Sequence, residues 1–205
     1  MNHPGPEEDS GKRWLRRDIL AVRSRLTADD VRETGAALAA RALELPELAH
    51  ARTVAAYVSV GSEPGTRALL DALRARGVRV LLPVLLADND LDWGAYEGHD
   101  SLVRVRHGDR MALLEPAGER LGPEAVLAAD AVLLPGLAVD GRGMRLGRGG
   151  GSYDRVLARL ERAAADPALV VVLLYDSEVV GLVPEEPHDR PVRAAVTPSG
   201  VHRFR

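Results

Sequence analysis

The residues best suited to chemistry lie in one glycine-rich stretch, residues 141–155. Six glycines between positions 141 and 151 surround Arg145 and Arg148, and a helical pattern of apolar residues begins at Tyr153. Glycines allow consecutive backbone N–H groups to point at one ligand, and the N-terminus of the following helix carries partial positive charge. Together with the two arginine charges, this pattern predicts an anion site whose expected ligand is a phosphate.

The end of this loop limits the kinds of enzyme it can serve. Gly151 is followed by Ser152, Tyr153 and Asp154, whereas the common P-loop requires Gly-Lys-Ser or Gly-Lys-Thr. Ser152 also lacks the Gly-x-Ser-x-Gly context of a hydrolase nucleophile, which argues against a serine hydrolase. Asp154 has two interpretations that the sequence leaves open, because it can offset the helix dipole or bind Mg²⁺ beside a phosphate.

Two other acidic positions are weaker candidates. Asp189 ends an acidic segment, residues 185–189, and it becomes a candidate metal ligand only if it lies near Asp154. His188 has no partner at the spacing of metal ligands, so we expect it to be structural. Glu63 follows a predicted strand, where its carboxylate is able to accept hydrogen bonds from an amino-heterocycle.

Lys12 is the only lysine of the chain, since 26 of the 27 basic residues are arginines. An ammonium group is a compact point charge and a guanidinium group is a planar fork, so the two are not interchangeable at sites of specific geometry. The lone lysine is therefore either a specific ligand or an accident of composition, and the composition leaves both interpretations open.

Length and composition exclude several classes of protein. The 205 residues suffice for one domain with a full core, and the absence of cysteine excludes disulfides, thiolate metal sites and a cysteine nucleophile. A net charge of −3 from interspersed acids and bases argues against nucleic-acid binding. The apolar runs are too short to cross a membrane, and no signal-peptide pattern precedes them. We therefore expect a cytoplasmic monomer that binds a small molecule.

The elements that position these residues can be predicted from periodicity. Residues 1–10 lack apolar periodicity, so we predict a disordered tail followed by a single domain over residues 11–205. Helical spacing begins near Lys12, and Thr27 is a start signal for a second helix. A helix over residues 153–165 follows the glycine-rich loop. Length and β-branching predict buried strands, which lie at residues 53–60, 78–85, 130–134, 169–174 and 192–196.

Helices that alternate with wholly apolar strands predict a three-layer α/β/α domain around a mostly parallel sheet. Residues 91–96 and 101–105 alternate like exposed strands, which we interpret as an antiparallel flap. In open parallel sheets, ligands bind outside the carboxyl ends of the strands. The segments after the strands are therefore expected to converge at one site, and these are residues 61–66, 140–154, 176–178 and 185–189.

Residues 134–140 and 145–154 resemble the signature of a known enzyme family. They read Leu-Pro-Gly-Leu-Ala-Val-Asp and Arg-Leu-Gly-x-Gly-x-Gly-x-Tyr-Asp. Both segments are similar, almost letter for letter, to 5-formyltetrahydrofolate cyclo-ligases, which are also called 5,10-methenyltetrahydrofolate synthetases. Supporting matches follow the same order along the chain, at Lys12-Arg-x-x-Arg16, Tyr57-x-Ser-x-x-x-Glu63-x-x-Thr66, Leu82-Pro83, Glu115-Pro116 and His188-Asp189.

This resemblance implies an activity and a fold. Enzymes of the family use ATP and Mg²⁺ to convert 5-formyltetrahydrofolate into 5,10-methenyltetrahydrofolate, ADP and phosphate, so the chain is expected to be a ligase of folate metabolism. The formyl oxygen is expected to take the γ-phosphoryl group before N10 attacks the activated carbon. The implied fold is similar to that of sugar-phosphate isomerases and CoA transferases.

The resemblance also implies a role for each matching residue. The catalytic residues would be Lys12, Arg145, Arg148 and Tyr153. The ATP would be bound by Lys12, Arg13, Arg16, Arg145, Leu146, Gly147, Arg148, Gly149, Gly150, Gly151, Ser152 and Tyr153. The folate substrate would be bound by Arg16, Val58, Glu63, Arg148, Gly149, Gly150, Gly151 and Ser152. The Mg²⁺ ligands would be Asp154 and Asp189.

Three positions depart from the family pattern. Ser152 stands where many relatives have an aromatic residue, Pro64-Gly65 replaces an apolar-acidic pair, and Arg193 stands where an acid is common. We expect these departures to alter affinity and pocket shape more than the reaction type. Two alternatives stay open, namely a protein that binds reduced folate or nucleotide without turnover and a sugar-phosphate isomerase on the same scaffold.

Overall fold

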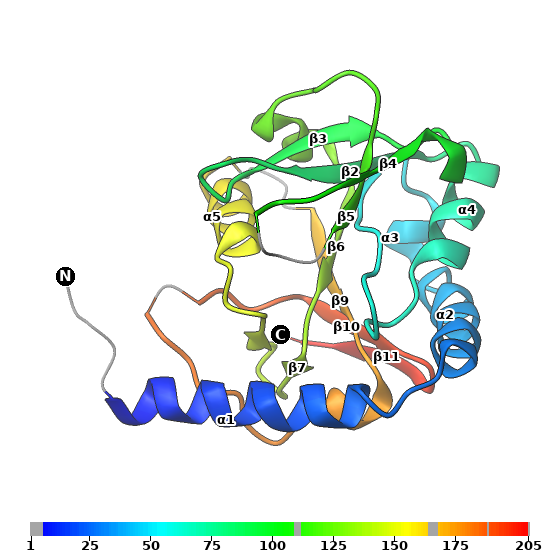
Figure 1. Ribbon diagram of the computed structural model, residues 1–205. Coiled ribbons are helices and arrows are strands. Elements are labelled where there is room, and N and C mark those ends of the chain that lie inside the picture. Colours follow the sequence, from blue (N-terminus) through cyan, green and yellow to red (C-terminus); the bar gives the residue numbers. More distant parts are fainter. Residues whose placement is uncertain (1–5, 109–111, 164–167, 188, 205) are drawn as a thin grey trace.

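The computed structural model describes residues 6–108, 112–163, 168–187 and 189–204 of the chain (Figure 1). Its helices are α1 (Pro6–Arg23), α2 (Ala28–Ala42), α3 (Pro46–Ala49), α4 (Arg67–Ala75) and α5 (Ser152–Ala163), with 3₁₀ turns η1 (His99–Ser101), η2 (Pro123–Ala128) and η3 (Asp176–Glu178). Its strands are β1 (Thr53–Ala55), β2 (Arg79–Leu85), β3 (Leu91–Ala95), β4 (Leu102–Val105), β5 (Leu113–Pro116), β6 (Ala131–Pro135), β7 (Ala138–Val139), β8 (Arg145–Leu146), β9 (Leu169–Leu173), β10 (Ala194–Thr197) and β11 (Gly200–Arg203).

A seven-stranded sheet forms the centre of the fold, in the order β11-β10-β9-β6-β1-β2-β3. The five inner strands run parallel to one another. Only the edge strands β3 and β11, among the described residues, pair antiparallel within this sheet. The predicted mostly parallel sheet is therefore confirmed. The pairs β4-β5 and β7-β8 form two small separate ladders.

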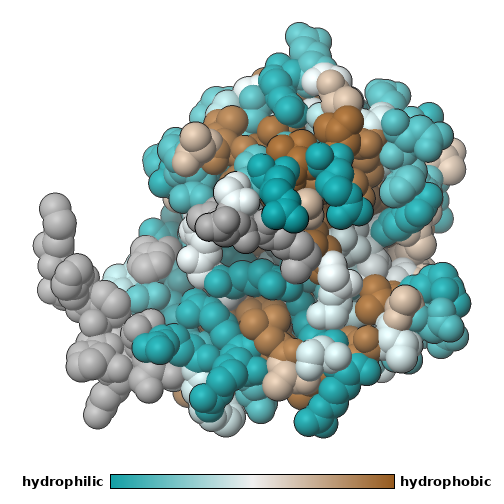
Figure 2. Space-filling model, in the orientation of Figure 1, coloured by the Kyte–Doolittle hydropathy of each residue, from teal (hydrophilic) through white to brown (hydrophobic). Residues whose placement is uncertain are grey.

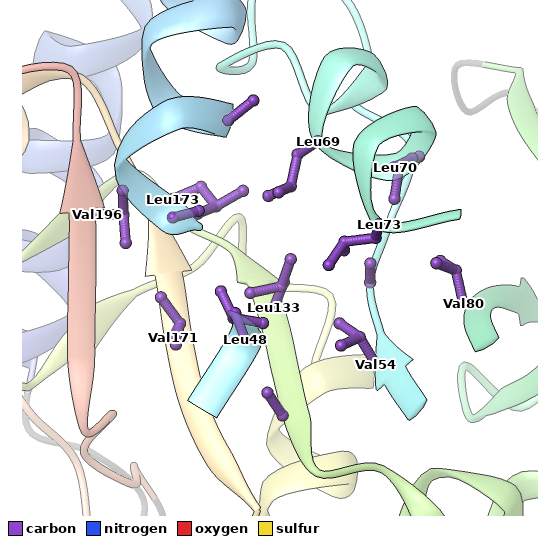
Figure 3. Close-up of a cluster of buried hydrophobic side chains, with 14 of the residues drawn as sticks. Leu48, Val54, Leu69, Leu70, Leu73, Val80, Leu133, Val171, Leu173 and Val196 are labelled. Atoms are coloured by element: carbon purple, nitrogen blue, oxygen red, sulfur yellow. The ribbon is translucent and has the colours of Figure 1, made fainter. Parts of the chain in front are cut away.

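Two hydrophobic cores cover the two faces of the sheet, because successive residues of each strand point to opposite sides. Val54 and Leu133 face a core that α2 and α4 cover, part of which Figure 3 shows. Ala55 and Val132, their chain neighbours, face a second core that α5 covers. Each fully buried leucine contributes about 1.5–3 kcal/mol relative to an exposed one. The three-layer α/β/α prediction is confirmed by this arrangement.

Helix α1 lies outside these layers and crosses the carboxyl ends of β6 and β9 (Figure 1). Its Arg23 donates to the Gly136 carbonyl after β6 at 2.7 Å and to the carboxylate of Glu178 after β9 at 2.7 and 2.8 Å. Ile19 packs in a smaller core with Leu137 and neighbouring apolar residues. The helix is thus fixed against the edge of the sheet where ligands are expected.

Several sequence predictions differ from the structure at the boundaries. The first strand ends at Ala55 instead of residue 60, and residues 56–60 belong to no helix or strand. The predicted flap is wrong: β3 joins the main sheet beside β2, and β4 pairs with β5. Helix α1 begins at Pro6, within the predicted tail. That tail stays a prediction for residues 1–5, which lie outside the described residues.

Candidate active site

A cavity of about 240 Å³ lies at the carboxyl ends of β1 and β6. One wall is the glycine-rich loop, from Arg145 to Asp154, and another is the segment after β1 that carries Glu63. An apolar wall completes the cavity, and it consists of Val58, Val60, Pro83, Leu85, Leu91, Leu113 and Leu114. On the face in Figure 2, hydrophobic residues gather in the upper half, where β2 to β5 lie.

The glycine-rich loop is anchored at both ends. The β7–β8 ladder pairs Ala138 with Leu146 and fixes the first part of the loop, and helix α5 begins at Ser152. Gly149 and Gly151 have φ angles of 92° and 75°, which side-chain-bearing residues rarely adopt. These two glycines lie just before the N-terminus of α5, in the part of the loop that lines the cavity.

Arg145 lies beneath the loop with only 6% of its side chain exposed. One terminal nitrogen donates to the Pro135 carbonyl at 3.1 Å, and the other donates to Asp154 Oδ1 at 2.9 Å. Its Nε has no hydrogen-bond partner among the described residues. Burial lowers the pKa of Arg145, while the carboxylates of Asp154 and Asp189 raise it. An arginine held this way keeps an unused donor beside the cavity.

Arg148 connects the two polar walls of the cavity. Its Nε donates to Glu63 Oε1 at 3.2 Å, while Glu63 Oε2 accepts from the Val60 N–H at 2.9 Å. Arg148 is nearly half exposed, whereas Glu63 is 8% exposed. The structure therefore brings together two predicted binding residues that lie 85 positions apart in the chain.

The departure at Pro64-Gly65 has a packing reason. A Cβ on Gly65 would lie 2.9 Å from the Val31 carbonyl oxygen of α2, and a Cβ on Gly35 would lie 2.7 Å from the Gly65 carbonyl oxygen. Two glycines thus allow the loop that carries Glu63 to touch the helix backbone. The other two departures are a Ser152 that lines the cavity and an exposed Arg193, for which nothing in the structure gives a reason.

Three predicted ATP ligands lie on α1, beside the cavity and not in its lining. Lys12 is buried, and its Nζ donates to Glu186 at 2.5 Å and to Asp189 at 2.6 Å. Burial alone would lower the pKa of Lys12, but these bonds raise it. Arg16 Nε donates to the Gly147 carbonyl at 3.0 Å, and Arg13 is exposed.

The remaining predicted residues divide into those that line the cavity and one that does not. Tyr153 lines it, as do Val58 and the glycines of the loop. Burial raises the pKa of Tyr153, so its phenol stays protonated. Leu146 is 1% exposed and packs in the core below α1, so it is the predicted loop residue that does not line the cavity. His188 lies outside the described residues.

The two predicted metal ligands are each bound to a cationic side chain. Asp154 accepts from Arg145 and is about one third exposed, and Asp189 accepts from Lys12. The negative charges of both carboxylates raise the pKa of Arg145. Within the described residues, no cluster of three or more His, Cys, Asp or Glu side chains could hold a metal by itself. Both predicted ligands are carboxylates, and Mg²⁺ often binds one or two carboxylates and completes its shell with phosphate oxygens and water.

Sequence reasoning missed the apolar wall and one polar residue, Tyr57. Leu113 and Leu114 lie on β5, which no pattern had predicted, and the wall forms only because β2, β3 and β5 meet in space. Tyr57 is the first residue of the motif that contains Glu63, but its residue type alone predicts no role.

No helix of the described chain combines the length and apolar character needed to span a membrane.

The family model and the similar proteins of known sequence all name one family. Residues 8–198 match the model of the 5-formyltetrahydrofolate cyclo-ligase family. The chain is 46% identical over 154 residues to the 5-formyltetrahydrofolate cyclo-ligase of Mycolicibacterium smegmatis, which covers 72% of this chain and 74% of that protein. It is 33% identical over 185 residues to the Escherichia coli protein of the same name, covering 89% and 98%.

Solved structures agree with the sequence matches. The NMR structure of the 5,10-methenyltetrahydrofolate synthetase from Aquifex aeolicus is similar with a TM-score of 0.76 and 28% identity, covering 95% of this chain and 93% of that one. The synthetase from Mycoplasma pneumoniae is similar with a TM-score of 0.68 over 91% of this chain and 98% of that one. At 17% identity, this second likeness supports the fold alone.

Proposed function

The chain belongs to the 5-formyltetrahydrofolate cyclo-ligase family, and we propose that the cavity beside its glycine-rich loop binds Mg·ATP and 5-formyltetrahydrofolate together. The observation that carries this proposal is the convergence of Arg145, Arg148 and Glu63 on one cavity. The polar loop suits phosphates, and the apolar wall suits a flat ring. The family membership favours this reaction over a sugar-phosphate isomerase, which uses no ATP.

In the proposed reaction, the formyl oxygen attacks the γ-phosphorus of ATP, and ADP leaves. N10 of the folate then attacks the formyl carbon and loses its proton to solvent, the ring closes, and the C–O bond breaks to release phosphate. Transfer of a phosphoryl group is catalysed mostly by positioning and by neutralisation of charge. Mg²⁺ held by Asp154 and Asp189 would neutralise part of the phosphate charge.

The chain's own residues supply the remaining charge and position. Arg145 offers its unused Nε below the loop, and Arg148 and Lys12 add cationic groups on either side. Helix α5 begins with Ser152 and Tyr153, which line the cavity, and the partial positive charge at a helix N-terminus favours a phosphate. Glu63 is held as an acceptor for the amino groups of the pterin ring.

Tyr153 has a different role, because its protonated phenol is able to donate a hydrogen bond beside the reacting groups. Contact between the apolar wall and the ring would exclude water, which otherwise competes with N10 for the activated carbon.

The direct test mixes the protein with 5-formyltetrahydrofolate and Mg·ATP and follows the near-UV absorbance of the methenyl product together with ADP. We expect one ADP for each product molecule, and no product when either ATP or Mg²⁺ is left out. Product formed without nucleotide would contradict the phosphoryl route. Binding of folate with no ADP and no product would instead indicate the non-catalytic alternative.

A further inference from the structure

Tyr57 is a buried tyrosine whose hydroxyl has no hydrogen-bond partner among the described residues. The residue is 3% exposed, and its hydroxyl oxygen is itself buried. A buried hydroxyl without a partner destabilises a folded protein, whereas phenylalanine would fill nearly the same space without that cost. The hydroxyl therefore contributes nothing visible to the stability of the unliganded fold.

The position of Tyr57 links it to the active site. It follows β1 by two residues and lines the same cavity as Glu63 and Tyr153. Behind it, Arg23 fixes the cavity residue Gly136 through a 2.7 Å bond to its carbonyl oxygen. Burial raises the pKa of the Tyr57 hydroxyl well above its ordinary value, and the nearby Glu63 carboxylate raises it further. The hydroxyl is therefore protonated and able to donate.

The surroundings of Tyr57 match a ring that carries both amino and oxo groups. Glu63 accepts hydrogen bonds from Arg148 and from the Val60 N–H, and a carboxylate has about four acceptor sites. It therefore keeps capacity for ring N–H groups. Apolar side chains such as Val58 and Leu113 supply surfaces for the faces of the ring. The Tyr57 hydroxyl adds a donor that makes no hydrogen bond within the described residues.

We propose that the Tyr57 hydroxyl binds the folate substrate by donating a hydrogen bond to the carbonyl oxygen of its reduced pterin ring. Tyr57 would then donate to the ring carbonyl, and Glu63 would accept from the N–H groups of the same ring. The inference rests on the proposed function, because it takes the cavity to be the folate site.

The test measures two quantities for each of three proteins: the wild type, Tyr57→Phe and the control Tyr96→Phe. One quantity is the Kd for 5-formyltetrahydrofolate by calorimetry without nucleotide, and the other is the Tm of the unliganded protein. Tyr96 is a matched control because it is also buried, lies outside the cavity lining, and donates to Asp71 at 2.7 Å.

We expect Tyr57→Phe to weaken folate binding by about 5- to 50-fold, because the ring carbonyl loses its partner. Its Tm should stay equal or rise, since an unpaired hydroxyl is removed. Tyr96→Phe should show the reverse, with a lower Tm and unchanged folate affinity. The affinity of both variants for Mg·ATP should equal that of the wild type.

Three results would overturn the inference. An unchanged folate Kd in Tyr57→Phe would show that the hydroxyl does not bind the ring. A clearly lower Tm, with folate and nucleotide affinities reduced alike, would show that the hydroxyl has a structural partner. A wild type that binds Mg·ATP but shows no folate binding would contradict the proposed function, and this inference with it.

Discussion

The two ends of the glycine-rich loop each hold an arginine–aspartate pair, but the pairs differ in how fully they are satisfied. Asp140, at the first end, is completely buried and accepts hydrogen bonds from Arg142, from the Met144 N–H and from the Val183 N–H. At the second end, Arg145 keeps an unpartnered Nε and Asp154 is about one third exposed.

This difference in hydrogen bonding indicates that the two pairs have different roles, although they lie within 15 residues of each other. The Asp140 carboxylate is filled by donors from its own loop and from Val183, so it fixes the turn and holds residue 183 against it. The Arg145–Asp154 pair has an unused donor and an exposed acceptor, so it can bind a ligand without first breaking its own hydrogen bonds. We therefore assign structural work to the first end and ligand binding to the second.

The largest expected effect comes from Arg145→Lys at the second end. A lysine keeps the charge but lacks the planar fork that donates to Pro135 and Asp154 from two separate nitrogens and carries Nε as a third donor. We expect turnover of 5-formyltetrahydrofolate to fall by about 10²- to 10³-fold, with a Tm within a few degrees of the wild type. Steady-state product formation and thermal unfolding would measure both quantities.

Arg142→Lys is the matched control at the first end, because Arg142 is about half exposed and lies outside the cavity lining. We expect turnover within about twofold of the wild type, since this end makes no ligand contact. Equal losses of turnover in the two variants would contradict the division of the loop.

The next effect is on stability, through Asp140→Asn. The neutral amide cannot accept all of the hydrogen bonds that the carboxylate accepts, and it leaves Arg142 without its buried partner. We expect the free energy of unfolding to fall by about 3 kcal/mol, as measured by urea denaturation. A loss below about 0.5 kcal/mol would show that the first end is not a structural anchor.

A smaller effect concerns the dependence of stability on pH. Burial would raise the pKa of Asp140, but hydrogen bonds from Val183 and Arg142 outweigh it and hold the pKa below its ordinary value. The carboxylate therefore stabilises the fold fully above the unfolded pKa, about 3.9, and this contribution is lost as the pH falls through the folded pKa. The stability difference between wild type and Asp140→Asn should shrink below about pH 4, in denaturation curves at several pH values.

Much of the fold and the polar half of the site could be predicted from the sequence. Wholly apolar strands separated by amphipathic helices required a parallel sheet with helices on both faces, and the loop before Tyr153 contained enough glycine and arginine to predict an anion site. Thr27 and Asp30 form the predicted cap of α2, with reciprocal bonds of 2.8 and 3.2 Å.

The rest depends on contacts that no local pattern encodes. The alternation around Trp93 is typical of a strand with one exposed face, but these residues form β3, which belongs to the main sheet. Trp93 packs in the core that α5 covers and is fully buried. The contacts of Lys12 are also non-local, because its ammonium group donates to Glu186 and Asp189, which lie more than 170 residues away in the sequence. The apolar wall and Tyr57 likewise emerge only from the packing of separate strands.

The most direct test of the division of the loop is the effect of Mg²⁺ on nucleotide binding in Asp154→Asn, by calorimetry without folate. If Asp154 belongs to the ligand-binding end, Mg²⁺ should tighten ATP binding to the wild type, and this gain should be largely lost in the variant, while its Tm stays within a few degrees. An equal gain from Mg²⁺ in the two proteins would contradict the assignment of the second end to metal and phosphate binding.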